Sequence, residues 1–157
     1  MRICNYNCPG QLVIGGEKAA VDKAGELAKA AGARRLMPLR VSGPFHTPLM
    51  KPAGDALRER FASESFGGMK TPVLFNCLGR EKGEEAIAEL LERQVQSPVY
   101  MEDTIRRLME LGVDTVVEIG PGRALSGFVQ KTAGNAMTCY AVEDCQSLAA
   151  ALEALRA

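Results

Sequence analysis

From Pro72 to the C-terminus, short apolar runs alternate with longer segments whose apolar residues recur at helical spacing. The apolar runs, which have the composition of buried strands, are residues 73–75, 113–119 and 137–142. The segments with helical spacing are residues 84–96, 102–111, 124–132 and 144–155. Such alternation is typical of helices packed on a mainly parallel sheet. The sequence therefore predicts an α/β fold with a mainly parallel sheet from Pro72 onward.

The first 41 residues follow a different pattern. Residues 3–7 and 11–15 have the composition of two short strands, and Cys8-Pro9-Gly10 between them predicts a turn. Residues 17–31 have helical spacing, and residues 36–41 predict a third strand that Gly43-Pro44 ends. We interpret residues 1–41 as a small subdomain without its opening strand and helix, and place the boundary at 42–48.

Composition narrows the class of protein. The chain has 157 residues, of which 46% are hydrophobic and 24% charged, as in a soluble globular domain. The 19 basic residues equal the 19 acidic ones, which argues against a protein that binds nucleic acid or a membrane surface. No apolar run approaches the roughly 20 residues of a membrane span, and the first residues show no apolar signal region.

The five cysteines form neither a disulfide framework nor a zinc site. Cys4 and Cys8 are close in sequence, but no second cysteine pair or nearby histidine completes a metal site. We expect five reduced thiols in a cytoplasmic protein with no metal and no cofactor.

The single histidine, His46, lies in the segment VSGPFHTPLM (41–50) between two prolines. Imidazole is the side chain that changes charge near neutral pH, and two flanking prolines would hold it stiffly. A lone histidine is more often a hydrogen-bonded structural residue than a catalytic one. From this segment alone both interpretations stay open, and His46 is a candidate catalytic residue.

A second segment of interest is EIGPGRALSG (118–127), which predicts a strand, a glycine turn and the start of a helix. Such a turn can present backbone N–H groups to an anion. Alternatively, its glycines serve only the backbone conformation of a tight turn. The segment lacks the lysine and hydroxyl pair of a nucleotide-binding P-loop.

Taken together, four stretches resemble the malonyl-CoA:acyl-carrier-protein transacylases of fatty-acid synthesis. These are NYNCPGQLVIGG (5–16), VSGPFH with PLM (41–50), EIGPG with LSG (118–127) and the weaker RQV with SPV (93–99). Their order and spacing agree with the family throughout. The resemblance covers nearly the whole chain, but only the C-terminal half of the family.

The resemblance implies a fold and an activity. The fold would be a partial ferredoxin-like subdomain (1–41) followed by the C-terminal part of an α/β-hydrolase-like parallel-sheet domain (42–157). Family members use a serine in a Gly-His-Ser-Leu-Gly turn and a histidine base to move malonyl from coenzyme A to the carrier-protein thiol. His46 matches that histidine, and Gln94 matches the position whose backbone carbonyl orients the ring. Asn7 and Phe45 match residues that line the acyl pocket, and Phe45 fits the malonyl-selecting pattern.

The chain also departs from the family pattern, and these departures matter as much for its function as the matches do. The chain has no Gly-x-Ser-x-Gly, so the nucleophile, the arginine that follows it and part of the oxyanion hole are missing. We therefore expect a C-terminal portion of a transacylase that is inactive alone and whose partners are malonyl-CoA, acyl carrier protein and the N-terminal half of the enzyme. A truncated reading frame, a late start and a split enzyme all fit. The alternative is a non-catalytic module that binds carrier protein or acts as a scaffold.

Overall fold

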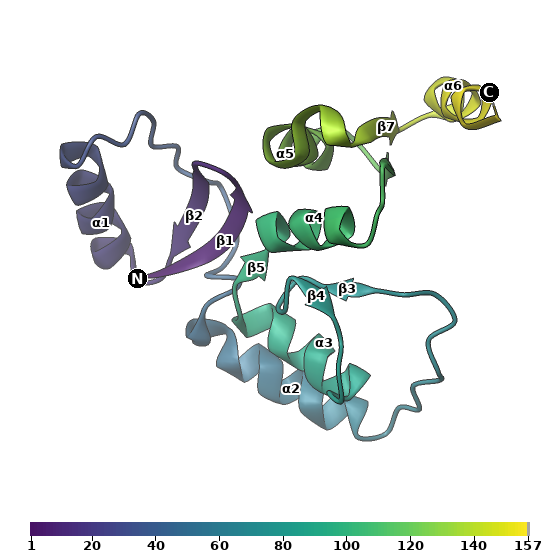
Figure 1. The fold of residues 1–157 in the computed structure, drawn as a ribbon. Helices are drawn as coiled ribbons and strands as arrows, with labels where there is room; N and C mark the ends of the chain where they lie inside the picture. The colour runs from purple at the N-terminus through teal and green to yellow at the C-terminus, as the bar shows by residue number, and fades with distance from the viewer. Residues whose placement is uncertain (157) are drawn as a thin grey trace.

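The computed structural model describes residues 1–156, which form six α-helices and seven strands (Figure 1). The helices are α1 (Lys18–Ala30), α2 (Lys51–Phe61), α3 (Ile87–Gln96), α4 (Met101–Glu110), α5 (Ala124–Ala133) and α6 (Cys145–Arg156). The strands are β1 (Arg2–Cys8), β2 (Gln11–Gly15), β3 (Leu74–Phe75), β4 (Arg80–Glu81), β5 (Val99–Tyr100), β6 (Thr115–Ile119) and β7 (Thr138–Val142). Two short 3-10 helices are η1 (Pro48–Met50) and η2 (Gly134–Ala136).

The strands form three small sheets rather than one mainly parallel sheet, so that expectation was wrong. β6 and β7 pair in parallel over their full length, while β3 and β4 form a short antiparallel pair. The third sheet has the order β2-β1-β5, antiparallel between β1 and β2 and parallel between β1 and β5. The fold is thus mixed α/β, and β1 of the first 41 residues shares a sheet with β5 of the remainder.

The β1–β2 hairpin follows directly from the local sequence. The turn places Gly10 at φ +74°, a left-handed conformation that glycine adopts without steric cost. Cys8 then pairs with Gln11 across the turn, and two bulges interrupt the ladder before Arg2 pairs with Gly15. The predicted strand 11–15 matches β2 at both ends.

The predicted third strand, residues 36–41, does not form. This segment carries no strand hydrogen bonds, and Leu39 and Val41 are 57% and 66% exposed. An extended apolar segment becomes a strand only when a neighbour supplies the other half of its hydrogen bonds, and among residues 1–156 no strand pairs with it.

Two hydrophobic clusters hold the helices in place. Ile105 of α4, Val129 of α5 and Met137 form one, with partly buried residues of β6 and β7 around them. Phe75 of β3, Cys77 and Leu90 of α3 form the other. In Figure 1, α4 lies below α5 and beside β1, while α2 and α3 form a separate layer below. The loop with His46 joins these two parts.

Two further observations concern the described residues. All five cysteines are free thiols, three of them buried. Within residues 1–156 no helix combines the length and apolar character needed to cross a membrane.

Candidate active site

His46 lies in the loop that precedes η1 and α2, and its backbone is in the left-handed region at φ +61°. It is the only non-glycine residue in the described chain with positive φ. For an ordinary side chain this conformation costs about 1–2 kcal/mol. Such a conformation persists only where surrounding contacts enforce it, and it occurs most often at functional sites.

The imidazole of His46 is held by backbone carbonyls at the end of α3. Its Nδ1 lies 2.9 Å from the Gln94 carbonyl oxygen and 3.2 Å from that of Ser97. The His46 backbone N–H donates to the Val95 carbonyl oxygen at 3.0 Å. Because a carbonyl oxygen can only accept, Nδ1 must carry the ring hydrogen of the neutral imidazole. Nε2 therefore keeps its lone pair and can accept a proton.

The end of α3 explains why these carbonyls are available. The last four carbonyls of a helix lack partners within it. Pro98, four residues after Gln94, has no N–H to donate and disfavours a helical conformation at Ser97. Ser97 is accordingly extended, at φ −116° and ψ 153°.

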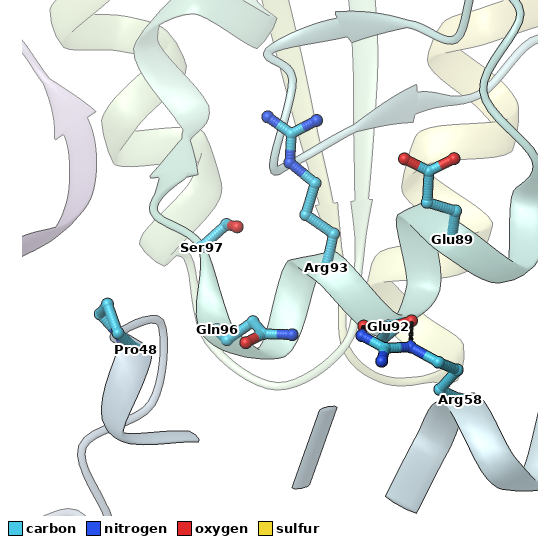
Figure 2. Close-up of a pocket in the computed structure, with 7 residues that line it drawn as sticks. All are labelled: Pro48, Arg58, Glu89, Glu92, Arg93, Gln96 and Ser97. Carbon is cyan, nitrogen blue, oxygen red and sulfur yellow. Dashed lines mark hydrogen bonds and ion pairs between the residues drawn. The ribbon is translucent and has the colours of Figure 1, made fainter. Parts of the chain in front are cut away.

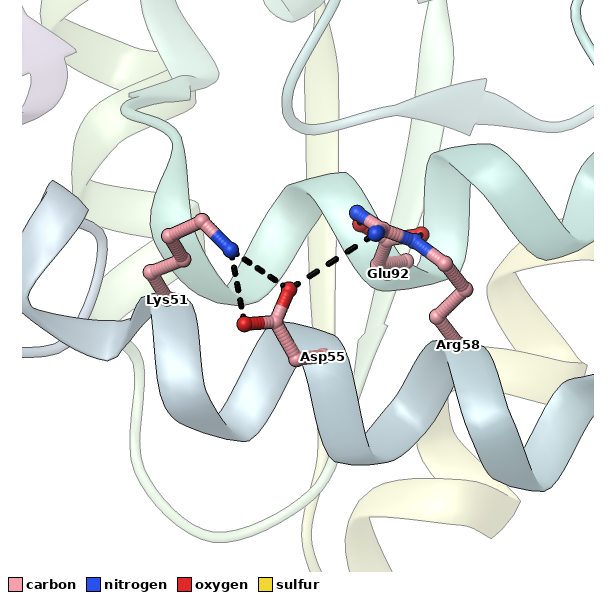
Figure 3. A network of polar contacts seen from close by, with 4 residues as sticks. All are labelled: Lys51, Asp55, Arg58 and Glu92. Carbon is pink, nitrogen blue, oxygen red and sulfur yellow. Dashed lines mark hydrogen bonds and ion pairs between the residues drawn. The ribbon is translucent and has the colours of Figure 1, made fainter.

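An ion-pair network clamps α2, which follows the His46 loop, against α3, which supplies the carbonyls (Figure 3). Arg58 of α2 binds both carboxylate oxygens of Glu92 on α3. Asp55 accepts from Lys51 at 2.7 and 2.8 Å and lies 3.7 Å from Arg58. The hydrogen bond from Arg58 holds the pKa of Glu92 below its ordinary value. The network therefore links the helix that follows His46 to the helix whose carbonyls hold its ring.

An open groove of about 460 Å³ borders this site (Figure 2). Its walls come from η1, α2, α3 and the residue that follows α3: Pro48, Arg58, Glu89, Glu92, Arg93, Gln96 and Ser97. The Arg58 and Glu92 charges in its wall neutralise each other. The groove thus reaches Ser97, one of the two residues whose carbonyls hold the ring.

The other two predicted site residues are Asn7, in strand β1, and Phe45, in the loop that carries His46. Asn7 is half-buried near the end of β1, and no described hydrogen bond joins its side chain to His46. Phe45 precedes His46 and is 43% exposed.

The structure also shows two contributors to the site that the sequence did not indicate. They are the Ser97 carbonyl and the buried side chain of Thr47. Because the first acts through its backbone, no side-chain pattern could have revealed it.

In the glycine turn, carboxylates already occupy the backbone N–H groups that an anion would need. Glu118 accepts from the N–H groups of Leu125 and Ser126 at 3.0 and 2.7 Å, and from the Ser126 hydroxyl at 2.5 Å. Glu143 accepts from the Gly122 N–H at 2.9 Å. The turn therefore serves to start α5, and the interpretation as an anion site is not supported.

Glu118→Gln should lower the free energy of unfolding at neutral pH by about 0.3–1 kcal/mol, because it removes a negative charge from the N-terminus of α5. Burial raises the pKa of Glu118, but hydrogen bonds from Ser126 and Leu125 outweigh it and hold the pKa below its ordinary value. A lowered pKa gives stability at neutral pH that is lost as pH falls below about 4.3. Urea unfolding at pH 7 and pH 3 measures this loss.

The matched control is Glu59→Gln on the exposed surface of α2, which removes the same charge from the last turn of a helix, where a carboxylate gains nothing from the helix dipole. We expect the stability difference between Glu118→Gln and the parent chain to shrink towards pH 3. An equal difference at both pH values would mean that the Glu118 charge does not cap α5.

Comparison with known proteins supplies the family. The chain is 43% identical over 157 residues to the malonyl CoA-acyl carrier protein transacylase of Bacillus subtilis, covering 99% of this chain and 49% of that protein. The crystal structure of the malonyl CoA-acyl carrier protein transacylase from Clostridium perfringens matches with a TM-score of 0.94 and 42% identity, over 99% of this chain and 49% of that one.

A further match is a malonyl-transacylase solved in complex with its type II PKS acyl-carrier protein. Its TM-score is 0.90 at 44% identity, over 97% of this chain and 49% of that one. No family model matches the chain. The chain spans about half the length of the curated relatives it matches. In sequence and fold it belongs with the malonyl CoA-acyl carrier protein transacylases and corresponds to the C-terminal half of such a protein.

Proposed function

We propose that this chain supplies the general base of a transacylase that moves a malonyl group from coenzyme A to acyl carrier protein. One observation carries the proposal. His46 has its Nδ1–H directed at two carbonyl oxygens, which leaves Nε2 free to accept a proton. The relatives' names, and the acyl-carrier protein bound to one of them, give the substrates.

In the proposed reaction the nucleophile is a serine hydroxyl on the N-terminal half of the enzyme. His46 Nε2 takes the serine proton as the serine oxygen attacks the malonyl thioester carbon. The carbon–sulfur bond then breaks, and the coenzyme A sulfur leaves as a thiol with the proton from Nε2. The carrier-protein thiol regenerates the serine by the same steps in reverse. Because carbonyls orient the ring, no acidic residue is needed for this purpose.

The finer parts of the proposal rest on the resemblance. Asn7 and Phe45 would line the acyl pocket, with Phe45 selecting malonyl over branched groups by its bulk. Residues 1–41 would belong to a ferredoxin-like subdomain and residues 42–157 to an α/β-hydrolase-like domain. The N-terminal half would add the strands that these parts lack, and the enzyme would act in the cytoplasm.

Alone, the chain should form no acyl-enzyme. Loss of the nucleophile typically costs several orders of magnitude in rate, and no described serine hydroxyl bonds to His46. Two of the serine hydroxyls, those of Ser126 and Ser147, are engaged by Glu118 and Asp144. Incubation with radiolabelled malonyl-CoA should leave no label that hydroxylamine releases.

The same assay with the N-terminal half of a relative added tests the proposed function. Label should then appear on the added half and pass to acyl carrier protein. A stable ester on a serine of this chain would overturn the assignment of the nucleophile. Binding of carrier protein without any transfer, in a fully assembled complex, would favour a non-catalytic module instead.

A further inference from the structure

The side chain of Thr47 connects the two flanks of the histidine loop. It is the one buried polar residue among residues 1–156, with 1% of its surface exposed. Its hydroxyl donates to the Pro44 carbonyl oxygen at 2.6 Å and accepts from the Leu49 N–H at 3.3 Å. These partners lie on either side of His46, so the hydroxyl closes the loop around the histidine.

The methyl group of Thr47 lies next to the β1–β2 hairpin. A Cβ atom placed on Gly15 of β2 would lie 3.4 Å from Thr47 Cγ2, so the methyl group lies close above that strand. On the opposite side, His46 is bonded to the end of α3 through its backbone N–H and its ring. The loop is therefore held from both sides, and His46 is the residue between them.

We propose that Thr47 is a positioning residue, whose hydroxyl holds His46 in its left-handed backbone conformation and thereby directs Nδ1 at the carbonyls of α3. Residue 46 has an unfavourable backbone conformation, and such a conformation requires contacts that over-determine it. The Thr47 hydroxyl supplies two of them within three residues of His46. The claim that this position of the His46 ring matters for catalysis rests on the proposed function. The claim that Thr47 holds the ring in this position does not.

The first test reads the His46 ring directly. As the chain has one histidine, isotopically labelled histidine gives a single pair of ring-nitrogen NMR signals, which solid-state spectra resolve whatever the particle size. At alkaline pH we expect the parent chain to show the hydrogen on Nδ1. Thr47→Ser, which keeps the hydroxyl, should preserve this spectrum. Thr47→Val, which keeps the methyl group, should shift it towards Nε2–H. Identical spectra for all three chains would overturn the proposal.

The second test separates positioning of His46 from a general contribution to the fold. Glycine adopts positive φ without strain, so in the His46→Gly background the hydroxyl has no strained residue to hold. Thr47→Val should therefore lower the folding equilibrium constant several-fold less in that background than in the parent. Equal losses in both backgrounds, or failure to fold in both, would show that the hydroxyl serves the fold rather than residue 46.

The third test uses the enzyme reconstituted with the N-terminal half. Thr47→Val should lower kcat by about tenfold or more, because small displacements of a catalytic group have large effects on rate. KM should stay nearly unchanged, and Thr47→Ser should recover most of kcat. A loss in KM alone would contradict a positioning role. If the reconstituted parent enzyme were inactive, the proposed function would fail while the NMR result still decided the role of Thr47.

Discussion

His46→Ala should reduce malonyl transfer by about a hundredfold or more in an enzyme reconstituted from this chain and the N-terminal half of a relative. That magnitude is typical for loss of a general base. The ring is the group whose Nε2 is free and whose Nδ1–H is fixed by two carbonyls. Steady-state transfer to acyl carrier protein, at saturating malonyl-CoA, measures the loss as a fall in kcat.

Gln94→Ala is the matched control, because the contact to His46 uses the Gln94 backbone carbonyl, which alanine retains. We expect this variant to keep most of its activity. Circular dichroism and urea unfolding should show that His46→Ala still folds, since a half-buried loop side chain contributes little to the core. A reconstituted enzyme that tolerates His46→Ala at full rate would leave only the similarity of fold.

Most elements of the fold could be predicted because each carries its own periodic pattern. The hairpin turn and β2 are determined by their own sequence, because Pro9-Gly10 forms a turn between two strand-forming runs. The same holds for α5, which begins at Ala124 as predicted and ends one residue beyond the predicted residue 132. α6 begins after Asp144, whose carboxylate accepts from the Ser147 N–H at 2.7 Å.

Elements that depend on a distant partner could not be predicted in the same way. β5 has two residues and exists because Val99 and Tyr100 meet Asn5 and Tyr6 of β1. Conversely, residues 36–41 have strand composition but no strand beside them. In both cases the composition is compatible with a strand, and the partner decides the outcome.

In the candidate site, too, some residues could be predicted from the sequence and others depend on the folded structure. His46 could be selected from the sequence because its side chain is chemically distinctive. The contributions of Gln94 and Ser97 come through backbone carbonyls, which every residue has. Only the family resemblance indicated Gln94, and nothing indicated Ser97. Thr47 has no distinctive sequence signal, because its burial depends on the folded structure around it.

Purified alone, the chain should self-associate, because the β6–β7 sheet is incomplete. Parallel sheets in α/β proteins are normally covered on both faces. Here β6 pairs with β7 on one edge only, and Val117 and Ile119 on one face of β6 are 40% and 83% exposed. An uncovered strand edge with apolar side chains favours association with other chains. Sedimentation velocity should show oligomers that diminish when the N-terminal half is co-expressed.

Ile119→Lys tests whether this edge is responsible. A lysine there should reduce self-association and also weaken assembly with the N-terminal half by about ten- to a hundredfold, since burial of one isoleucine contributes about 1.5–3 kcal/mol. Leu27→Lys on α1 is the matched control, because Leu27 is 60% exposed and α1 lies on the opposite side of Figure 1 from β7, the partner strand of β6. That variant should associate like the parent. If the parent chain is instead a monodisperse monomer that unfolds cooperatively, the β6 edge is stable without a partner and the chain is a self-sufficient domain.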